Sequence, residues 1–486
     1  MNVYFTDYFA VSFEDMDAYG AFNISLINDL PVFIDPFLLF NSEKQEYQML
    51  HERIIKYITF LREMSEAGTI SKGLVQHWFL FPEVKQNWLG FSKVGNGGSG
   101  LGEKFASAMN DNLSTIFTNF GSEQITKSSH LEKLCLVKDG VGKDSISDFT
   151  TNLIKGFLCE YTETFASEYI DKSRTKSVMV PHAEFNYQTR RWVGKKFVLP
   201  YIDGDFIVLT PKDILTKDEA WINKHDIIGD FDDILASIPN LQLRGQINDY
   251  FLRRIPEDAK QREINEAVSK TLRHFPELID RYIRLKEDTG EQAVAISEQK
   301  IRETEVIFIR QVSELIEELR DESKFYSTDD DTHEEAYKRV VFLKQVIENN
   351  DGYRIFYVKG QPIKREADLQ LMFRLTWYAS EDDVNSEVNN GRGPVDYKIS
   401  RGSKDSTLVE FKLASNSKLK QNLAKQVEVY KAANQTKKSI KVILYFSDTE
   451  LAKVQKVMRE LELKESKELV LIDAQATNKQ SGSNAK

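Results

Sequence analysis

The sequence contains few cysteines and no long apolar run, and these two absences narrow the class of protein. Only Cys135 and Cys159 are cysteines among the 486 residues. Both stand in apolar segments, so we expect buried free thiols in a reducing compartment rather than a disulfide framework. No segment approaches the ~18 uncharged apolar residues of a membrane span, and the N-terminus lacks the pattern of a secretory signal. We therefore expect a cytoplasmic protein with no membrane partner.

Other common functional motifs are also missing. The seven histidines are scattered, and with two cysteines they form no zinc-binding spacing. A Gly-x-Ser-x-Gly nucleophile motif is absent as well. Residues 93–105 (KVGNGGSGLGEKF) have glycines in the spacing G-x-G-x-x-G, but no clear strand precedes them and Glu103 stands where a phosphate-binding loop has lysine. We expect a turning loop here and predict no organic cofactor, although its amides could hold a phosphate.

Charge is plentiful but differs in sign between the two parts of the chain. The total of 65 Lys plus Arg against 75 Asp plus Glu gives a net charge of −10, which argues against nucleic-acid binding over the whole surface. Residues 353–486 hold 24 basic and 17 acidic residues, a net charge of +7, whereas the first 352 residues have a net charge of −17. The basic surplus is concentrated between Lys398 and Arg459. We expect any nucleic-acid contact there.

Hydrophobic periodicity divides the chain into three regions and a tail, as its length requires. Residues 1–230 mix β-like runs with helical patterns, which predicts an α+β domain that recognises a substrate or a trigger. Residues 231–352 have a helical pattern, which predicts a helical connector between the first and third regions. Residues 353–475 have the element order αβββαβαβ, which predicts an α/β domain with a central mixed sheet flanked by helices. Residues 476–486 are polar and predict a disordered tail.

Two features of the connector leave its role open. Apolar residues recur at intervals of seven over residues 294–319, interrupted by Glu298 and Glu305. Either a helical hairpin packed within the chain or a coiled coil that forms a homodimer has this pattern. Residues 327–335 (STDDDTHEE) are acidic and polar, which favours a solvated loop or linker.

Acidic residues in the first region have simple structural interpretations. Asp144 lies at the start of a helical pattern, four residues before Asp148, and we expect it to be the N-cap. Asp203 and Asp205 could form an acid-plus-lysine group with Lys212, but we expect them to mark a turn between strands.

Two strand-like runs of the third region carry polar residues on one face. In VDYKIS (395–400) and TLVEFKL (407–413), alternation places the odd-numbered apolar residues on the packed face. Asp396, Glu410 and Lys412 then share the other face. A turn centred on Ser403 would pair Asp396 with Glu410, with Cβ atoms about 5 Å apart. Two such carboxylates suit Mg²⁺ or Mn²⁺, and Lys412 could position a water or stabilise charge on a phosphate.

These segments resemble the PD-(D/E)XK nuclease superfamily. The resemblance rests on GRGPVDYKIS (391–400), LVEFKLA (408–414) and the element order around them. The superfamily pattern of an Asp followed by Glu-x-Lys maps onto Asp396, Glu410 and Lys412, although Val395 separates the aspartate from the preceding proline. It implies a restriction-endonuclease-like fold and a phosphodiester hydrolase in which Asp396 and Glu410 bind Mg²⁺ or Mn²⁺.

Further residues of the resemblance lie on helices. Gln426 and Tyr430 in KQVEVYK are similar to the Gln-x-x-x-Tyr element of the RecB-like branch, which implies a supporting catalytic role. Glu366, on the first helix, is a candidate for the acidic residue that the family often places there, or a carboxylate that stabilises the helix dipole. The basic residues that we expect to contact nucleic acid are Lys398, Arg401, Lys418, Lys420 and Lys425.

The functional expectation is therefore a metal-dependent nuclease, with DNA favoured over RNA. A large recognition region fused to this fold is similar in layout to bacterial restriction and anti-phage defence effectors, which is an analogy. The alternatives are a DNA repair or recombination nuclease and a non-catalytic module that binds nucleic acid. The sequence does not decide whether a partner protein or a nucleotide triggers the activity. Residues 1–350 resemble no family known to us.

Overall fold

The computed structural model divides the chain into two compact units, an N-terminal unit of residues Tyr4–Ile301 and a C-terminal unit that begins at Arg302. The structure describes residues 4–479 apart from a set of gaps. These gaps are residues 27–28, 69, 91–100, 103–104, 107–108, 111–112, 114–119, 138–140, 203, 218, 256–259, 307–308, 310–330, 350–351, 359–360, 364–366, 378–382, 390–393, 402–404 and 425–437. Of the predicted Gly-rich loop, residues 93–100 and 103–104 lie in these gaps.

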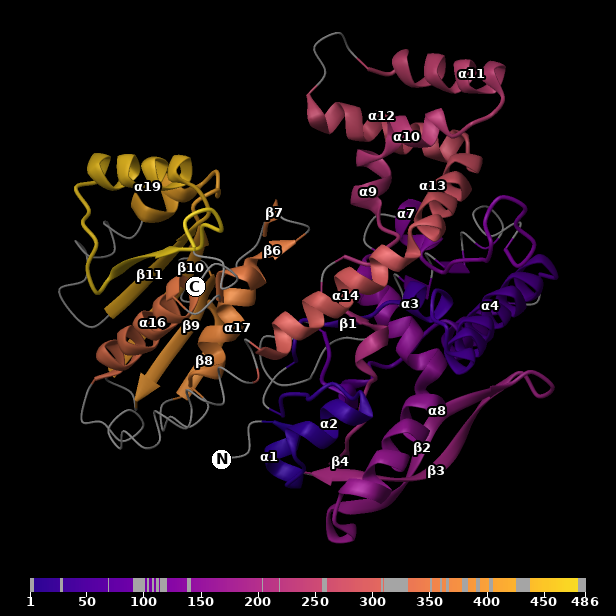
Figure 1. Ribbon diagram of the computed structural model, residues 1–486, viewed down its shortest axis with the longest axis horizontal. Coiled ribbons are helices and arrows are strands. Elements are labelled where there is room, and N and C mark those ends of the chain that lie inside the picture. The colour runs from indigo at the N-terminus through magenta and orange to yellow at the C-terminus, as the bar shows by residue number, and fades with distance from the viewer. Residues whose placement is uncertain are drawn as a thin grey trace, which may run out of the picture. The chain divides into compact units, whose positions relative to one another are not determined.

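The N-terminal unit combines helices with small sheets, as predicted (Figure 1). Its first helices and strands are α1 (Phe5–Phe9), α2 (Phe13–Tyr19), β1 (Phe33–Ile34), α3 (Pro36–Phe40), α4 (Gln45–Glu66), α5 (Lys72–Trp78), α7 (Lys133–Val137), α8 (Lys143–Tyr169), β2 (Thr175–Asn186), β3 (Arg191–Ile202), β4 (Asp205–Phe206) and β5 (Leu215–Thr216). The helices α9 (Lys224–Gly229), α10 (Phe231–Ala236), α11 (Leu241–Leu252), α12 (Gln261–His274), α13 (Glu277–Asp288) and α14 (Gly290–Thr304) follow.

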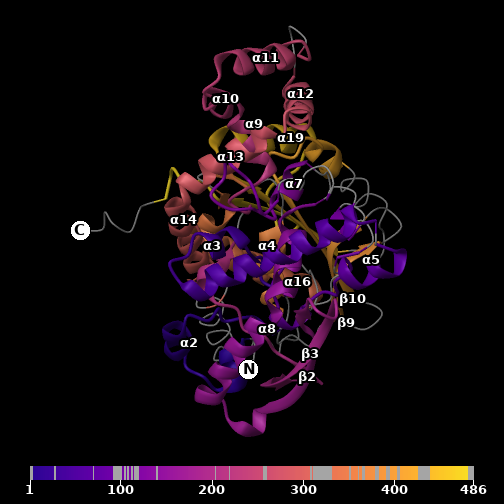
Figure 2. The same cartoon turned by 90° about the vertical axis from the view of Figure 1, so that its right-hand side faces the viewer.

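Helix α8 is the central element of this unit. Many of its apolar residues are fully buried, among them Phe149, Leu158 and Phe165, as expected for a helix that packs on a core. It lies along the β2–β3 hairpin in both Figure 1 and Figure 2, and the two elements are in contact. Cys159, which α8 carries, and Cys135 are both buried and free, as predicted.

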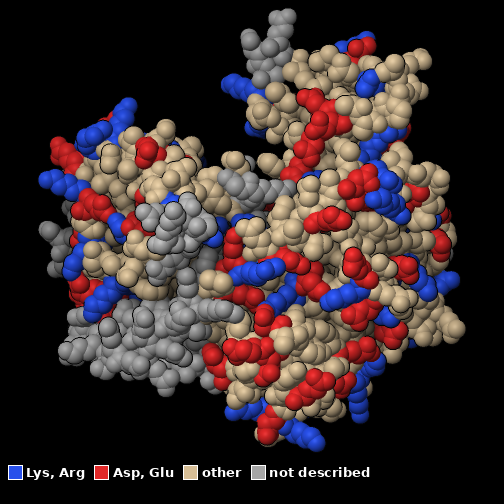
Figure 3. All heavy atoms as spheres, in the orientation of Figure 1, with Lys and Arg blue, Asp and Glu red and all other residues tan. Residues whose placement is uncertain are grey.

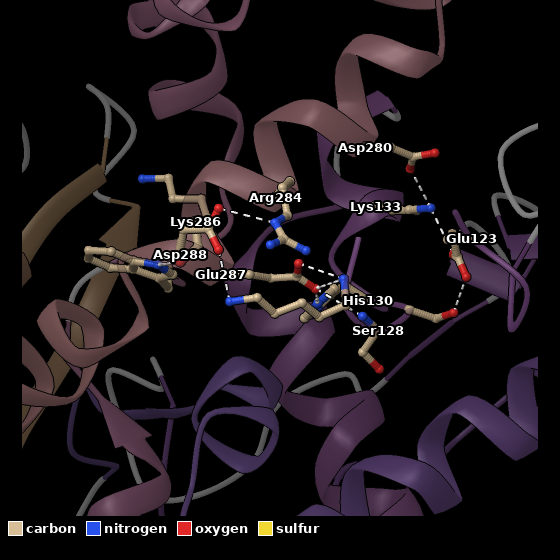
Figure 4. Close-up of polar contacts among 12 residues, drawn as sticks. Glu123, Ser128, His130, Lys133, Asp280, Arg284, Lys286, Glu287 and Asp288 are labelled. Atoms are coloured by element: carbon tan, nitrogen blue, oxygen red, sulfur yellow. Dashed lines mark hydrogen bonds and ion pairs between the residues drawn. The ribbon is translucent and has the colours of Figure 1, made fainter. Parts of the chain in front are cut away.

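Helix α13 is fastened to residues 127–130 by the buried carboxylate of Glu287 (Figure 4). This carboxylate accepts hydrogen bonds from the amides of Lys127 (2.7 and 2.9 Å) and Ser128 (3.0 Å). The Nε2 of His130 lies 3.0 Å away from it. Burial lowers the pKa of His130 in spite of this carboxylate. A neutral ring that donates through Nε2 accounts for the arrangement.

A second buried contact reinforces the same junction. Lys133, which is 1% exposed, pairs with Glu123 at 2.8 Å and with Asp280 of α13 at 2.7 Å (Figure 4). Two carboxylates around the ammonium compensate for the hydration that it loses on burial. A buried charge without such partners would strongly destabilise the fold. These networks hold the helical part of the unit against its core.

Of the predictions for acidic residues of this unit, one is wrong and one is confirmed. The N-cap of α8 is Gly142, and Asp144 lies inside the first turn. Its negative charge interacts favourably there with the positive end of the helix dipole. Asp203 lies outside the described residues. Asp205 pairs with Lys85 at 3.2 Å, whereas Lys212 pairs with Asp17 at 2.6 Å. The expected turn before Asp205 is confirmed, because Gly204 adopts a φ of 88° there.

The C-terminal unit is built around a mixed five-stranded sheet, which confirms the predicted α/β architecture. Its elements are α16 (Thr332–Asn349), β6 (Tyr357–Val358), β7 (Gln361–Pro362), α17 (Ala367–Leu375), β8 (Asp383–Asn389), β9 (Pro394–Arg401), β10 (Asp405–Leu413), β11 (Lys438–Tyr445), α19 (Asp448–Glu460) and β12 (Leu469–Asp473). The strand order is β12-β11-β10-β9-β8. Strands β10, β11 and β12 are parallel, whereas β8, β9 and β10 are antiparallel.

Helices cover both faces of this sheet. Phe373 of α17 packs on Phe411 with ring centroids 5.2 Å apart, and the hydroxyl of Tyr397 donates to the carbonyl of Gln370 at 2.8 Å. Helix α16 lies against β9, β10, β11 and β12. A separate apolar cluster joins α19 and the helical residues 419–424 to Ile443. The even-numbered residues of β9 and β10 therefore lie on the face away from α17.

Helix α16 corrects the sequence prediction for residues 332–335, whereas residues 327–330 of the acidic run lie outside the described residues. The helix begins at Thr332 because the side chain of Asp331 accepts hydrogen bonds from the amides of His333 (3.0 Å) and Glu334 (3.1 Å). Its charges are not merely solvated, since the buried Arg339 and Glu335 form an ion pair. Residues placed in the connector by their composition thus form part of the C-terminal unit.

Other expectations remain predictions. Of the seam at 294–319, the structure describes α14, with Ile301 buried inside the chain and Val294 half-buried, whereas most later positions lie outside the described residues. The choice between a hairpin and a homodimer is therefore open. Most of the predicted tail also lies outside them. None of the described helices has a stretch long and apolar enough to cross a membrane.

Candidate active site

The hairpin of β9 and β10 has the predicted register. Its paired residues run from Asp405 with Arg401 to Val409 with Tyr397, and each of these pairs is symmetric about position 403. Continued by one step, this register sets Asp396 opposite Glu410. The hydrogen bond from the amide of Phe411 to Oδ2 of Asp396, 2.6 Å long, holds the aspartate across the two strands. The turn therefore brings the two carboxylates to one face of a rigid sheet.

Lysines join the two carboxylates. The Nζ of Lys412 lies 3.1 Å from Oε1 of Glu410 and 3.9 Å from Oδ2 of Asp396. The same ammonium donates to the carbonyl of Phe411 at 2.9 Å. The side chains of Asp396, Glu410 and Lys412 are 15%, 22% and 16% exposed, respectively. The three predicted residues, Asp396, Glu410 and Lys412, thus lie together and form a triad. Each side chain is largely buried but keeps some surface in contact with solvent.

A residue that we did not predict, Lys441, completes the cluster from the next strand. Lys441 of β11 is the register partner of Glu410, and its Nζ lies 3.1 Å from Oε2 of that glutamate. It also donates to the carbonyl of Asn422 at 2.6 Å. The sequence does hold a signal, because SIKVILYF (439–446) has a lone charge in an apolar run, and a buried lysine almost always has a partner.

Burial and charge act against each other in this cluster. Burial raises the pKa of Glu410, but the charges of Lys441 and Lys412 outweigh burial and leave the pKa below its ordinary value. Burial lowers the pKa of Lys441, and the attraction of Glu410 offsets only part of this effect. Glu410 is therefore ionised at neutral pH, as a metal ligand must be.

The two carboxylates meet one requirement of a site for a hard divalent cation, but the lysines beside them oppose metal binding. Two carboxylates from neighbouring strands are the number of protein ligands with which Mg²⁺ is usually held, and the remaining positions go to water and phosphate oxygens. Each oxygen of Glu410 is paired with a lysine, so a metal would have to displace at least one of them. Among the described residues, no group of three or more His, Cys, Asp or Glu side chains could hold a metal.

The supporting residues are only partly placed. Glu366, Lys425, Gln426 and Tyr430 lie outside the described residues, so their proposed roles stay predictions. The first described residue of α17 is Ala367, and this helix covers the face of the sheet opposite the triad.

The expected nucleic-acid contacts differ in their surroundings. Lys398 is half-buried and shares the parity of Asp396 on β9, so it lies on the face of the triad. Arg401, Lys418 and Lys420 are exposed. Lys420 already pairs with Glu460 at 2.7 Å, which weakens its attraction for a phosphate.

Two family models match parts of the chain. Residues 11–223 match a family described as a domain of unknown function (DUF8370), and residues 332–448 match a second family with the same description (DUF8371). No curated protein and no solved structure matches. The second match begins at the first residue of α16 and includes the triad and Lys441. A recurrent domain thus contains both α16 and the candidate site.

Proposed function

We propose that the C-terminal unit is a metal-dependent nuclease that hydrolyses phosphodiester bonds, with DNA as the favoured substrate. The observation that carries the proposal is the placement of Asp396, Glu410 and Lys412 on one face of β9 and β10, within 3.9 Å of the Lys412 ammonium. The mixed sheet with helices on both faces is compatible with the PD-(D/E)XK resemblance. The residues of the resemblance and the geometry therefore support the same chemistry.

Each residue has a separate role in this proposal. Asp396 and Glu410 would hold Mg²⁺ or Mn²⁺, which when bound would polarise the phosphate and activate a water. Lys412, anchored by the carbonyl of Phe411, would stabilise negative charge on the phosphate or hold the attacking water. Lys441 would hold the carboxylate of Glu410 in place until a metal displaces it. Gln426, Tyr430 and Glu366 would assist, as the resemblance implies.

The local charge supports a polyanionic substrate. Between Lys398 and Arg459 the sequence has 14 basic residues against five acidic ones. Each phosphate contact with duplex DNA should steepen the dependence of binding on salt by about 0.9 in the double-logarithmic slope. A basic surface around a small cluster of carboxylates is the charge pattern that such an enzyme needs.

The deciding experiment is cleavage of supercoiled plasmid, linear duplex, single-stranded DNA and RNA by the full chain. Each substrate is incubated with Mg²⁺, Mn²⁺ or EDTA. We expect metal-dependent cleavage that Glu410→Gln and Lys412→Ala each abolish. Glu465→Gln is the matched control, because Glu465 also pairs with a lysine, at 3.2 Å, but on the surface. Cleavage that persists undiminished in both site variants would refute the assignment.

A second candidate function is a non-catalytic module that binds nucleic acid. It is favoured by the pairing of both Glu410 oxygens with lysines, which leaves the cluster nearly neutral and obstructs a metal. Binding of DNA without cleavage of any substrate, in either metal, would establish this function instead.

The biological setting rests on layout alone. We propose a bacterial restriction or anti-phage defence effector, in which the N-terminal unit senses a feature of the target and the C-terminal unit cuts. A DNA repair or recombination nuclease is the alternative. Phage plating on cells that express the wild type or Glu410→Gln separates the two, because only a defence effector lowers plating efficiency in a way that depends on Glu410.

A further inference from the structure

The N-terminal unit contains a cavity of about 450 Å³ that none of its predicted sites explains. Small-molecule sites have volumes of roughly 300–1,000 Å³. The walls of this cavity come from α4, α8 and the β2–β3 hairpin, and α4 is distant in sequence from the other two. A second cavity, of about 550 Å³, adjoins it and shares Phe157 and Glu160 of α8.

Positive charge without a partner stands on one wall. Arg53 and Lys56 are exposed and lie three positions apart on α4, so they share a helix face. Lys195, on the opposite wall, is paired with Glu160. Within the described part of the chain, no carboxylate pairs with Arg53 or Lys56. On the face of this unit in Figure 3, acidic side chains gather over α1 and α2, and α2 carries the exposed Glu14, Asp15 and Asp17.

Aromatic rings line the rest of the cavity. Tyr57, Phe185 and Trp192 pack against one another with ring centroids 5.0–5.4 Å apart. Tyr187 is half-buried, and the Nζ of Lys56 lies 4.5 Å from its ring centroid. The buried Nε1 of Trp192 finds no hydrogen-bond partner among the described residues. Half-buried aromatic rings such as Tyr187 and Trp192, beside cations that have no carboxylate partner, are elements with which proteins hold a nucleobase and its phosphate.

The backbone is distorted where the hairpin meets α8. Strand β2 shifts register between Val180 and Glu184, and His182 in this bulge has a φ of 54°, which is rare outside glycine. Gly156 of α8 permits the close approach, since a Cβ there would lie 2.7 Å from the carbonyl oxygen of Ala183. Bulges of this kind re-aim side chains and recur beside binding sites. Both Gly156 and Ala183 line the cavity.

We propose that this cavity binds a nucleoside monophosphate unit, with its phosphate at Arg53 and Lys56 and its base against Tyr187 and Trp192. A phosphate monoester carries nearly two negative charges at neutral pH, which two cations would balance. The guanidinium of Arg53 can bind a phosphate through two parallel hydrogen bonds. The unit is either a free nucleotide or the 5′-phosphorylated end of a strand, which share this chemistry. The inference does not depend on nuclease activity.

The test is calorimetric titration of the full chain in EDTA, which removes divalent metals from the C-terminal site. The probes are AMP, adenosine, inorganic phosphate and a 5′-phosphorylated tetra-adenylate. We expect AMP to bind, and adenosine and phosphate to bind about tenfold more weakly or less, because each lacks half of the contacts. The double variant Arg53→Ala/Lys56→Ala should weaken AMP binding at least about tenfold. Tyr187→Ala should weaken AMP without changing phosphate.

A matched control separates local contacts from overall charge. Arg191→Ala/Lys196→Ala removes the same charges from exposed positions of β3 outside the cavity lining, and should leave AMP binding unchanged. Tetra-adenylate bound more tightly than AMP, with the same loss in Arg53→Ala/Lys56→Ala, would identify a strand end as the ligand. No binding of AMP or tetra-adenylate at about millimolar concentration, or binding that Arg53→Ala/Lys56→Ala leaves unchanged, would overturn the proposal.

Discussion

Replacement of the buried Glu132 by leucine should stabilise the N-terminal unit, and more so as the pH rises. Glu132 is 0% exposed, and neither of its carboxylate oxygens has a hydrogen-bond partner in the structure. Burial, helped by the charge of Asp35, raises its pKa to about 8 from an ordinary 4.5. Asp35 accepts hydrogen bonds from the amides of Phe37 (3.0 Å) and Trp221 (2.8 Å). Of the two acids, Glu132 is therefore the one that stays protonated at neutral pH.

The sign and size of the effect follow from linkage. Because the folded-state pKa of Glu132 is raised, the folded protein binds more protons than the unfolded chain between pH 4.5 and about pH 8. Stability from this group is thus lost as the pH rises through that window. At 1.36 kcal/mol for each pKa unit, the loss is about 3 kcal/mol at pH 7 and under about 1 kcal/mol at pH 5. Because leucine cannot ionise, the Glu132→Leu variant does not lose this free energy of unfolding as the pH rises.

The assay is urea unfolding of the full chain at pH 5, 7 and 8, followed by tryptophan fluorescence. Four of the five tryptophans, Trp78, Trp88, Trp192 and Trp221, belong to the N-terminal unit, so the signal reports mainly on it. Glu132→Gln is the matched variant, because it removes ionisation but keeps a buried polar group. A free-energy difference between Glu132→Leu and wild type that is equal at pH 5 and pH 8 would refute the reasoning.

Three further predictions concern other parts of the molecule. Glu287→Ala should destabilise the N-terminal unit by about 3–5 kcal/mol in urea unfolding, since it orphans two amides and a histidine. Gly156→Ala should cost about 1–3 kcal/mol in the same assay, because its Cβ would meet the carbonyl oxygen of Ala183 at 2.7 Å. Lys441→Met should tighten Mn²⁺ binding, measured by calorimetry, about fivefold, since it removes a competing ion pair worth about 1 kcal/mol from Glu410.

Each of these predictions has a control of the same chemical type. Glu291→Ala changes an exposed glutamate near Glu287 and should be almost neutral. Gly245→Ala, in a helix where an added Cβ meets nothing within 4 Å, should be neutral or stabilising. Lys456→Met removes an exposed lysine of α19 and should leave Mn²⁺ binding unchanged. A variant that behaves like its control would contradict the contact assigned to the residue.

The β9–β10 hairpin could be predicted because its information is local. Alternation decides which face Asp396, Glu410 and Lys412 share, and the position of the turn decides the register. Lys441 was missed because its partner lies on β10, and a parallel neighbour cannot be assigned from a single strand. The cavity of the N-terminal unit was missed for the same reason, since Arg53, Gly156 and Trp192 come together only through tertiary packing.

Composition also misled where charges are buried. Helix α16 has the charge content of a solvated connector, but Arg339 is fully buried and its guanidinium carbon lies 4.0 Å from the ring centroid of Trp377. Its Nε donates to the carbonyl of Thr376 at 3.2 Å. A buried and paired charge looks the same in the sequence as a solvated one. The helical pattern was therefore predicted, but the assignment of this helix to the C-terminal unit was not.

Helix α16 therefore sets the N-terminal boundary of the segment that can fold, and be exchanged between proteins, as one domain. A fragment that starts at residue 353 would contain every strand of the sheet, yet it would leave bare the apolar surface that Val340, Leu343 and Ile347 now cover. Such a fragment should aggregate, whereas one that starts before Asp331 keeps the helix together with its cap. Recombination between distant proteins would preserve the candidate site only where the crossover falls upstream of this helix.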